Sequence, residues 1–301
     1  MQIMYPKQYE YKFYPQKVPL FTYDTIAEIL SQIEKNANKI RITIDLGLTY
    51  SIGKIIGNYI QIDKYSVSIE TIKKHENRKK DDVVYAYIDG ELIPLTIYDD
   101  NRKNFYKLKC LGRSIAPTLE INGIHMHRIE GIDPFKDAEL KVRSLGKIRN
   151  AIILDTCMGL GYTAINAIKY GAKLVITVEK DPNVIKLASF NPWSWNLASS
   201  SIRTLHADIC TVIREIPDDS FTHIIHDPPR INIAGELYSL ELYKEFYRIL
   251  RPRGKIFHYT GAPGKHTNIR YLKGIKERLE KAGFVGIQWI DRAQGFLAFK
   301  L

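Results

Sequence analysis

The sequence predicts a chain of two domains, in which an α/β domain with a mostly parallel sheet follows a smaller α+β or mostly β domain. Three observations lead to this fold class. The length of 301 residues leaves room for about two domains of ordinary size. From residue 145 onward, short apolar runs alternate with segments of helical spacing, whereas before it apolar residues mostly recur at every second position. We therefore predict domains at 1–144 and 145–301.

The second half reads as strand and helix in alternation, which is typical of a parallel sheet with helices on both faces. The strands are predicted at 151–154, 175–178, 202–206, 221–225 and 256–259, and the helices at 163–170, 182–189, 237–250 and 268–281. The stretch Arg251-Pro252-Arg253-Gly254 is predicted to end helix 237–250. Two more strands, 284–290 and 296–301, have too short a link for a crossover helix, so they are predicted to be antiparallel.

The first half contains a predicted helix over 24–35, with Asp24 or Thr25 as its cap. Apolar residues alternate with polar ones from Ile40 to Ile44, as in a half-buried strand. Strands 83–88 and 92–98 flank Asp89-Gly90, which is a strong hairpin turn signal. A helix over 133–145 is predicted to lead into the α/β domain.

The charge and the cysteines limit the class of protein. A net charge of +11 favours a polyanionic partner or reflects a compositional bias. Two basic segments could contact nucleic acid, 73–80 and the aromatic-containing 102–109. Three cysteines without C-x-x-C spacing predict neither disulfides nor a zinc site. The pair His125 and His127 has no third ligand nearby in sequence, so we expect no metal.

The sequence also lacks an uninterrupted apolar stretch of the roughly 18 residues that a membrane helix needs, and residues 1–10 contain no apolar signal core. These features predict a cytoplasmic protein without a membrane partner. Nothing in the sequence indicates an oligomeric state.

The strongest chemical signal is the segment from Leu154 to Ala164, in which a strand stops at Asp155 and turns through Gly159 and Gly161 into a helix. Glycines let the backbone approach a ligand closely, and the helix N-terminus attracts an anionic group. Taken alone, the pattern also fits a dinucleotide fingerprint, with Glu179 on a ribose, as in an NAD-dependent dehydrogenase. A tight turn without any ligand is the other alternative.

Four carboxylates follow successive predicted strands. Asp155 ends the first strand, Glu179 the second, Asp208 follows the third, and Asp227 follows the fourth. The C-terminal ends of parallel strands form the edge at which open α/β sheets bind ligands. Glu179 can accept hydrogen bonds from ribose hydroxyls, Asp208 from an adenine amino group, and Asp155 from an amino group or water near the ligand.

With these residues the chain resembles class I S-adenosylmethionine-dependent methyltransferases over about residues 145–301. The stretches Asp155-Thr-Cys-Met-Gly-Leu-Gly, Asn191-Pro-Trp-Ser and Asp227-Pro-Pro-Arg resemble a group of predicted archaeal methyltransferases with an extra N-terminal domain. The resemblance implies a Rossmann-like, seven-stranded sheet with an antiparallel last strand, and S-adenosyl-L-methionine as cofactor. It places Gly159 and Gly161 at the methionine end, Glu179 with Lys180 at the ribose, and Asp208 with Ile209 at the adenine.

The stretch Asp227-Pro228-Pro229-Arg230 is similar to the D-P-P-aromatic motif of enzymes that methylate exocyclic nitrogens of bases or amide nitrogens. There the carboxylate and the following carbonyl accept hydrogen bonds from the target NH₂, so these four residues are the predicted catalytic set. Arg230 stands where the aromatic residue is usual, and its guanidinium can stack on a base or bind a phosphate. Trp193, Trp195 or Tyr259 is predicted to supply the stacking surface.

The sequence therefore predicts a methyltransferase that modifies an exocyclic amino group of rRNA or tRNA, such as N4 of cytosine, with the first domain binding the RNA. A protein or small-molecule amine is the alternative acceptor, for methyl or for aminopropyl transfer. A non-catalytic RNA-binding module is the alternative of another class. His226, next to Asp227, is a further candidate as a proton acceptor.

Overall fold

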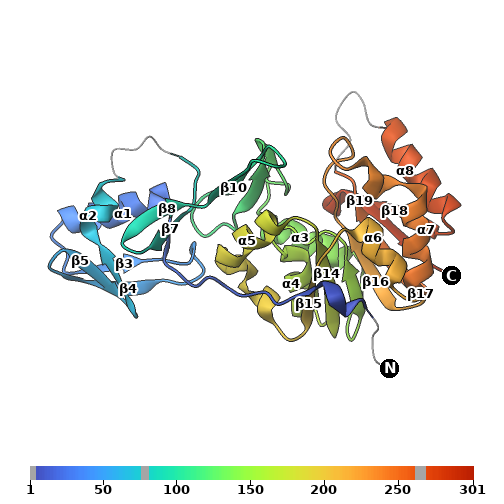
Figure 1. The fold of residues 1–301 in the computed structure, drawn as a ribbon, viewed down its shortest axis with the longest axis horizontal. Helices are drawn as coiled ribbons and strands as arrows, with labels where there is room; N and C mark the ends of the chain where they lie inside the picture. The colour runs from blue at the N-terminus through green and yellow to red at the C-terminus, as the bar shows by residue number, and fades with distance from the viewer. Residues whose placement is uncertain (1–4, 76–80, 262–268) are drawn as a thin grey trace. The chain divides into compact units, whose positions relative to one another are not determined.

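A computed structural model describes residues 5–75, 81–261 and 269–301 (Figure 1). The chain divides into two compact units. The large-sheet unit comprises residues 1–13, 135–182 and 196–301, and the small-sheet unit comprises residues 14–134 and 183–195. The domain boundary at 144/145 stays a prediction, because a compact unit need not be a segment that folds on its own. No helix in the described parts of the chain is both long and apolar enough to cross a membrane.

The large sheet has the strand order β1-β15-β14-β13-β16-β17-β19-β18. Its strands are β1 (Glu10–Tyr11), β13 (Ile152–Asp155), β14 (Leu174–Glu179), β15 (Ile202–His206), β16 (Phe221–His226), β17 (Leu250–Tyr259), β18 (Val285–Ile290) and β19 (Gly295–Phe299). The central strands β13 to β17 are parallel, and β19 is antiparallel to both β17 and β18. The alternation and the antiparallel final pair are confirmed.

The expected count of seven strands is wrong for the whole sheet, because β1 adds an eighth strand. It pairs antiparallel with the outer edge of β15, Glu10 opposite Leu205 and Tyr11 opposite Thr204. A two-residue strand is too short to give a periodic signal. Residues 251–254, which were predicted to end helix 237–250, do follow the end of that helix at Ile249. These residues lie inside β17, where Arg253 has φ +64° and the pairing with β16 shifts register as in a bulge.

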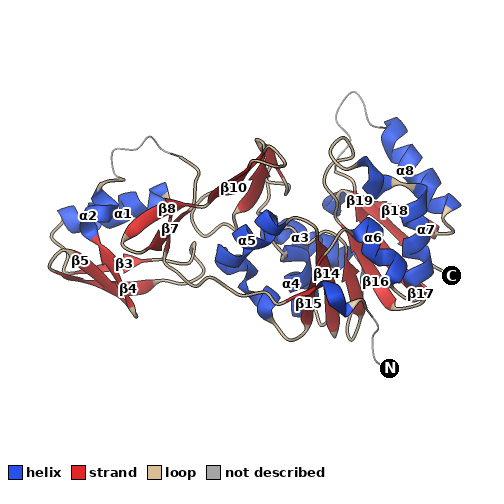
Figure 2. Cartoon of the chain, in the orientation of Figure 1, coloured by secondary structure: helices blue, strands red, loops and turns tan. Residues whose placement is uncertain are grey.

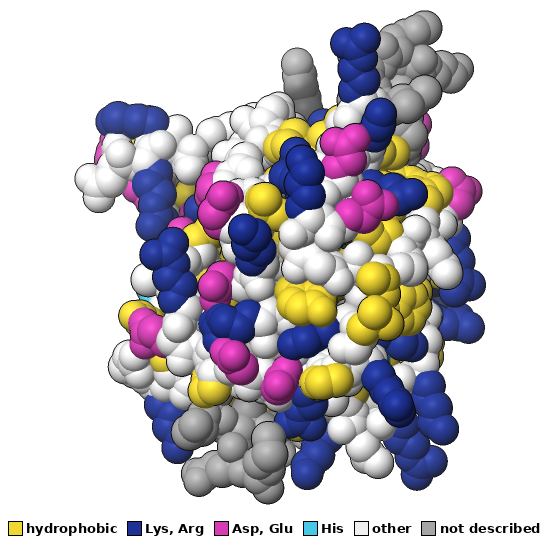
Figure 3. All heavy atoms as spheres, turned by 90° about the vertical axis from the view of Figure 1, so that its right-hand side faces the viewer, with side chains coloured by type: hydrophobic (Ala, Val, Ile, Leu, Met, Phe, Trp, Pro, Cys, Tyr) yellow, Lys and Arg dark blue, Asp and Glu magenta, His cyan; other side chains and the backbone are white. Residues whose placement is uncertain are grey.

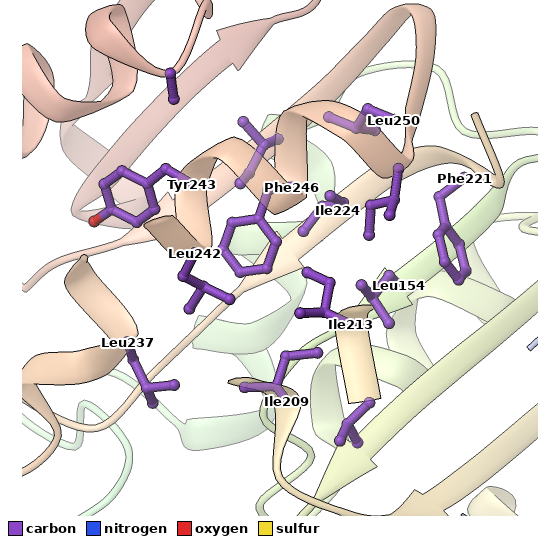
Figure 4. Packing of buried hydrophobic residues seen from close by; sticks show 14 of the residues in the cluster. Leu154, Ile209, Ile213, Phe221, Ile224, Leu237, Leu242, Tyr243, Phe246 and Leu250 are labelled. Carbon is purple, nitrogen blue, oxygen red and sulfur yellow. The ribbon is translucent and has the colours of Figure 1, made fainter. Parts of the chain in front are cut away.

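Helices cover the large sheet, namely α3 (Pro134–Ser144), α4 (Tyr162–Lys169), α6 (Ile209–Val212), α7 (Leu240–Ile249) and α8 (Ile269–Lys281). In α7 the buried residues Leu242, Phe246 and Ile249 recur at helical spacing. Figure 4 shows Leu242 and Phe246 packing toward Ile224 of β16 and Leu154 of β13. Full burial of such side chains contributes roughly 1.5–3 kcal/mol each. This packing holds the strand ends, and with them the candidate site, in place.

Short 3₁₀ segments occur at Lys7–Tyr9, Pro192–Ala198, Ile213–Glu215, Gly235–Tyr238 (η4) and Asp291–Ala293. Figure 3 views the face of the molecule that carries α7 and α8. On it, Lys and Arg side chains are interspersed with acidic and hydrophobic ones. On α8, Lys273 lies 3.8 Å from Glu277 and Lys276 lies 3.9 Å from Glu280. The positive charge of this helix is thus partly balanced.

The small-sheet unit contains three antiparallel sheets (Figure 2). Their orders are β2-β7-β8, β3-β4-β5-β6 and β12-β11-β10-β9. The strands are β2 (Leu20–Phe21), β3 (Lys39–Ile42), β4 (Ser51–Ile56), β5 (Tyr59–Ile62), β6 (Tyr65–Ser68), β7 (Tyr85–Ile88), β8 (Glu91–Pro94), β9 (Thr96–Asp99), β10 (Asn104–Lys109), β11 (Thr118–Ile121) and β12 (Ile124–His125). The helices are α1 (Tyr23–Glu34), α2 (Ile69–Lys73) and α5 (Pro182–Phe190).

Two local features of this unit were predicted, a hairpin turn and a helix cap. The hairpin at Asp89-Gly90 is confirmed, with φ values of +50° and +85°. The cap of α1 is Thr22, not Asp24 or Thr25. The Thr22 hydroxyl accepts from the Thr25 N–H at 3.3 Å, and the Thr25 hydroxyl accepts from the Thr22 N–H at 2.7 Å. This reciprocal capping box satisfies two backbone donors at once.

Candidate active site

The glycine turn after β13 uses its two glycines differently. Gly159 has φ +53° and Gly161 has φ +77°, conformations that favour glycine. A Cβ on Gly161 would lie 2.6 Å from the side chain of Leu197, so this glycine is needed for packing. A Cβ on Gly159 would meet nothing within 4 Å. The space above Gly159 is therefore open to a ligand.

Asp155 fastens this turn to the sheet. Its carboxylate is fully buried and accepts hydrogen bonds from the hydroxyls of Thr163, at 3.0 Å, and Thr177, at 2.6 Å. Burial raises the pKa of Asp155 to about 7, although the two hydroxyls oppose the shift. Since both oxygens are bonded within the protein, Asp155 contributes to a ligand site by fixing the start of α4 against β14.

Glu179, at the end of β14, contacts the same turn. One carboxylate oxygen accepts from the Gly159 N–H at 3.0 Å and the other from the Asp181 N–H at 2.9 Å. Burial raises the pKa of Glu179 to about 7. Each carboxylate oxygen can accept a second hydrogen bond. Glu179 thus joins the turn and the second strand, and keeps acceptor capacity for ligand hydroxyls.

Asp208 lies after β15 and caps α6, accepting from the Cys210 N–H at 2.8 Å. The Nζ atom of Lys180 lies 3.8 Å from its other oxygen and 3.6 Å from Glu236. Ile209 is buried in the core beneath. Glu179, Lys180 and Asp208 therefore stand at the ends of neighbouring strands, as predicted from the parallel order.

These residues fit S-adenosylmethionine by the chemistry of their donors and acceptors. Glu179 and Asp208 offer carboxylates for hydroxyl and amino hydrogens, and the open space over Gly159 admits a ligand close to the backbone. A dinucleotide phosphate over Gly159 would instead lie near the Glu179 carboxylate, which repels it.

A residue that the sequence reading missed lies at the centre of the site. Lys141 of α3 is only 1% exposed, and its Nζ atom lies 2.6 Å from Oδ2 of Asp227 and 3.0 Å from Oδ2 of Asp137. The same ammonium lies 3.8 Å from the ring centroid of Tyr259, at the end of β17. Burial alone would lower the pKa of Lys141, but the two carboxylates raise it above its ordinary value.

The signal for Lys141 was present in the sequence. Asp137 and Lys141 are four residues apart, and on α3 they fall on the same stripe as the buried Ala138, Val142 and Leu145. Charged residues are almost never fully buried unless they are paired. A lysine and an aspartate one turn apart on the apolar stripe of a helix therefore predict a buried ion pair.

Asp227 is the partner from the predicted catalytic set. Burial raises its pKa, and the charge of Lys141 opposes that shift. Its Oδ2 is occupied by Lys141, while Oδ1 has no partner within the described chain and the side chain is 17% exposed. Lys141, Asp137 and Asp227 together carry one excess negative charge. The open oxygen of Asp227 is thus an acceptor in a site that favours N–H donors.

The residues after Asp227 form a fixed turn. Pro228 is buried, and the Pro229 carbonyl accepts from the Tyr238 hydroxyl at 2.9 Å. The carbonyl of Arg230 accepts from the N–H groups of Ile233 and Ala234. The Arg230 guanidinium is exposed and has no hydrogen bond or ion pair to any described residue. The Arg230 guanidinium is thus an exposed cation three residues after Asp227 in the sequence.

His226 has no capacity left for proton transfer, so its candidacy as a proton acceptor was wrong. Its Nε2 donates to the Leu237 carbonyl at 2.8 Å, and its Nδ1 accepts from the Thr156 hydroxyl at 2.7 Å. Burial lowers the pKa of His226 to about 4. A neutral, fully bonded imidazole holds β16 against the turn after β13 and against η4.

The three predicted stacking residues belong to two different units. Tyr259 lies in the large-sheet unit, where its ring packs on Lys141. Trp193 is half-buried and lies in the small-sheet unit, where its backbone N–H donates to the Asn191 side chain at 3.2 Å. Trp195, in the same unit, donates its indole N–H to the Ser189 carbonyl at 3.2 Å. Their use as a stacking surface stays a prediction.

The cations of the basic segment 102–109 lie near carboxylates of the protein. Lys107 and Lys109 both lie within 3.0 Å of Asp82 and Glu120. Arg102 and Lys103 face Asp99 and Asp100, at 3.7 and 3.5 Å. Lys107 and Lys109 are thus held by carboxylates, whereas the side chains of Arg102 and Lys103 stay largely exposed, so contact of this segment with a polyanion stays a prediction.

Two weaker sequence signals can also be placed. Most of the basic segment 73–80 lies outside the described residues, and Lys74 lies 3.6 Å from Glu70. His125 contacts Glu120 at 3.1 Å, and His127 contacts the Thr118 hydroxyl at 3.0 Å. In the described ranges no three His, Cys, Asp or Glu side chains are grouped as a metal site.

The solved structures similar to this chain include two spermidine synthases. One, in complex with the transition-state analogue AdoDATO, has a TM-score of 0.57 and 19% identity, covering 68% of this chain and 72% of that one. The other, from Thermotoga maritima, has a TM-score of 0.53 and 18% identity, covering 68% and 71%. At this identity the likeness shows the fold alone.

Two proteins of Methanocaldococcus jannaschii are similar in sequence. The protein named "Putative protein N5-glutamine methyltransferase MJ0928" is 25% identical over 170 residues, 56% of this chain and 77% of that protein. "Uncharacterized protein MJ1233" is 41% identical over 286 residues, 92% of this chain and 96% of that protein. No protein-family model matches the chain. The chain therefore has a fold like that of the two spermidine synthases, and it belongs to the same family as MJ1233.

Proposed function

We propose that the protein is an S-adenosylmethionine-dependent methyltransferase that methylates an exocyclic amino nitrogen of a base in rRNA or tRNA, such as N4 of cytosine. One observation carries the proposal. The Asp227 carboxylate is held by Lys141 through one oxygen, its other oxygen is open, and the exposed Arg230 follows it after two prolines. Such a site can bind an NH₂ group and an anion of the same substrate.

S-adenosylmethionine, when bound, supplies a methyl group on a positively charged sulfur. Within the protein, Gly159 leaves the space for a ligand, and Glu179 and Asp208 accept hydrogen bonds from hydroxyl and amino groups. Asp155 does not contact the ligand in this proposal. It holds the glycine turn in place through its hydrogen bonds with Thr163 and Thr177.

Asp227 is proposed to orient the amino group. An exocyclic amine is a weak nucleophile because its lone pair is delocalised into the ring. An acceptor that holds its N–H fixes the direction of that lone pair, and the negative charge stabilises the positive charge that develops on nitrogen. Lys141 keeps Asp227 ionised and in one position, because its own charge is buried against Asp227 and Asp137. After transfer, the carboxylate can accept the proton that the nitrogen releases.

Arg230 distinguishes a nucleotide from a polyamine. Its guanidinium is exposed, three residues beyond Asp227, and bonded to no described residue. An arginine there attracts a phosphate and repels a cationic chain. RNA carries both an NH₂ group and phosphates, so it matches the pair Asp227 and Arg230 in charge.

Aminopropyl transfer to an amine is the second candidate, since the spermidine synthases named above share the fold. The excess negative charge of the group Lys141, Asp137 and Asp227 is the feature that would favour a cationic acceptor. A protein amide or amine is a third acceptor, suggested by the name of MJ0928. A non-catalytic RNA-binding module would keep the fold without transfer.

The experiment compares acceptors in one assay. Purified protein is incubated with methyl-labelled S-adenosylmethionine in three parallel reactions, which contain bulk RNA, cell-extract protein or a polyamine mixture. We expect label in RNA, none after Asp227→Ala, and equal cofactor affinity of both proteins in calorimetry. Label in the protein fraction would replace the RNA proposal. So would aminopropyl transfer to the polyamine mixture in a separate incubation that contains decarboxylated S-adenosylmethionine. Cofactor binding without any transfer would indicate the binding module.

A further inference from the structure

The outer face of the β3–β6 sheet is open and positively charged. Its inner face is buried in a core that includes Ile40, Ile60 and Val67. The side chains on its outer face are Lys39 and Arg41 of β3, Ile52, Lys54 and Ile56 of β4, and Tyr59 and Gln61 of β5, with Tyr50 just before β4. Ile52 and Ile56 are each 60% exposed and Tyr59 is 49% exposed. No acidic residue stands on this face among the described strand positions.

The three cations of this face are not neutralised. Lys39 and Lys54 are directly opposite one another in the antiparallel pair of β3 and β4. Like charges in such positions destabilise a sheet. Among described residues neither lysine has an ion pair, and Arg41 stacks over the ring of Tyr50 at 4.2 Å. This differs from segment 102–109, where every cation faces a carboxylate.

From this geometry we infer that the outer face of the β3–β6 sheet binds single-stranded RNA, with Lys39, Arg41 and Lys54 on phosphates and with Tyr50 and Tyr59 as stacking surfaces for bases. Basic side chains that alternate with exposed aromatic rings are what sequence-tolerant binding of single strands needs. The inference rests on the RNA partner of the proposed function and gives that RNA a place of contact in the small-sheet unit.

Charge decides between RNA and a second copy of this chain. A two-fold dimer through this face would place the same patch against itself. Lys39, Arg41 and Lys54 would then meet their own copies, and no carboxylate on the face would offset the repulsion. A polyanion instead relieves the repulsion between Lys39 and Lys54 that the unbound protein contains.

The test measures binding of the full-length protein to a fluorescein-labelled 12-nucleotide oligouridylate, by anisotropy at several salt concentrations and without S-adenosylmethionine. The variant Lys39→Gln/Lys54→Gln removes two charges from the face. The matched control Lys273→Gln/Lys276→Gln removes two charges from α8. Tyr59→Ala removes one ring. Thermal melting of each variant verifies that it is folded.

For single strands each phosphate contact contributes roughly 0.7 to the slope of log K against log salt. Loss of two contacts should therefore reduce the slope by about 1.4. If the variant and the unchanged protein bind equally at 1 M salt, the variant should bind roughly 25-fold more weakly at 0.1 M salt. Tyr59→Ala should weaken binding by about fivefold or more. The α8 control should bind like the unchanged protein, and the double Lys39/Lys54 variant should melt no lower.

Three results would overturn the inference. The oligouridylate does not bind, the sheet variant loses no more affinity than the α8 variant, or sedimentation shows a dimer that dissociates on Ile52→Glu. Because the assay contains no cofactor, it is independent of methyl transfer. Labelled RNA produced by a protein whose sheet variants bind unchanged would refute only the binding face. Normal binding without any transfer would refute only the proposed reaction.

Discussion

Replacement of Lys141 by Met is the perturbation that isolates the buried charge group. Methionine retains an unbranched apolar chain of similar length and removes the ammonium. The contacts of 2.6 Å to Asp227 and 3.0 Å to Asp137 are lost together. Two carboxylates then remain in the interior without a cation.

The expected cost follows from the burial of the group. Removing one partner of a buried ion pair destabilises a protein by about 3–5 kcal/mol, because the remaining charge is left uncompensated. In the variant, burial without the opposing charge of Lys141 keeps the pKa of Asp227 in the folded state above its unfolded value, near 3.9. The variant therefore loses stability as pH rises from about 4. The unchanged protein keeps the contribution of Lys141 below the unfolded lysine pKa, near 10.4.

The free energy of unfolding is measured by urea denaturation at several pH values between 4 and 9. We expect a deficit of about 3–5 kcal/mol near pH 8 that shrinks toward pH 4. Lys136→Met, an exposed position on α3, should cost less than about 0.5 kcal/mol. Adding Asp227→Asn to Lys141→Met should recover part of the loss. The reasoning is refuted if Lys141→Met costs no more than Lys136→Met, or if its cost does not change with pH.

Two further predictions concern the cofactor edge. The affinity for S-adenosylmethionine should fall as pH is lowered through about 7, by up to roughly tenfold per unit, because burial raises the pKa of Glu179 to about 7 and the ionised carboxylate is the acceptor. Calorimetry at pH 6 and 8 measures this, and equal affinities, or the same pH dependence in Glu179→Gln, would contradict it. Gly161→Ala should destabilise the protein more than Gly159→Ala, by about 1–3 kcal/mol, because only its Cβ meets Leu197. Urea denaturation compares them, and equal losses would contradict the packing role.

The large sheet could be predicted from the sequence because its strands are buried on both faces. They read as apolar runs, and β15 was placed at its observed residues while the other central strands except β17 were placed to within one or two. The order of the carboxylates followed directly, since parallel strands bring their C-terminal ends together. The two-residue β1 and the bulge at Arg253 could not be predicted, because each depends on pairing with a distant strand.

Charge was harder to predict than fold. Lys107 and Lys109 looked basic along the chain, but Asp82 and Glu120, distant in sequence, neutralise them. Lys141 lies on α3, which precedes the sheet, so it does not belong to the strand ends that predicted the other site residues. Its importance depends on Asp227, 86 positions away. The charged pair on the apolar stripe of α3 is a local pattern. The contact of that pair with Asp227 leaves none.

The most direct test of the proposed reaction is mass spectrometry of nucleosides from total RNA that has been incubated with the protein and S-adenosylmethionine. We predict a nucleoside that carries one or more added methyl groups on an exocyclic amino nitrogen, and its loss in Asp227→Ala with unchanged calorimetric affinity for the cofactor. An unchanged nucleoside profile, or full methylation by Asp227→Ala, would contradict the assignment of Asp227 and of the RNA acceptor.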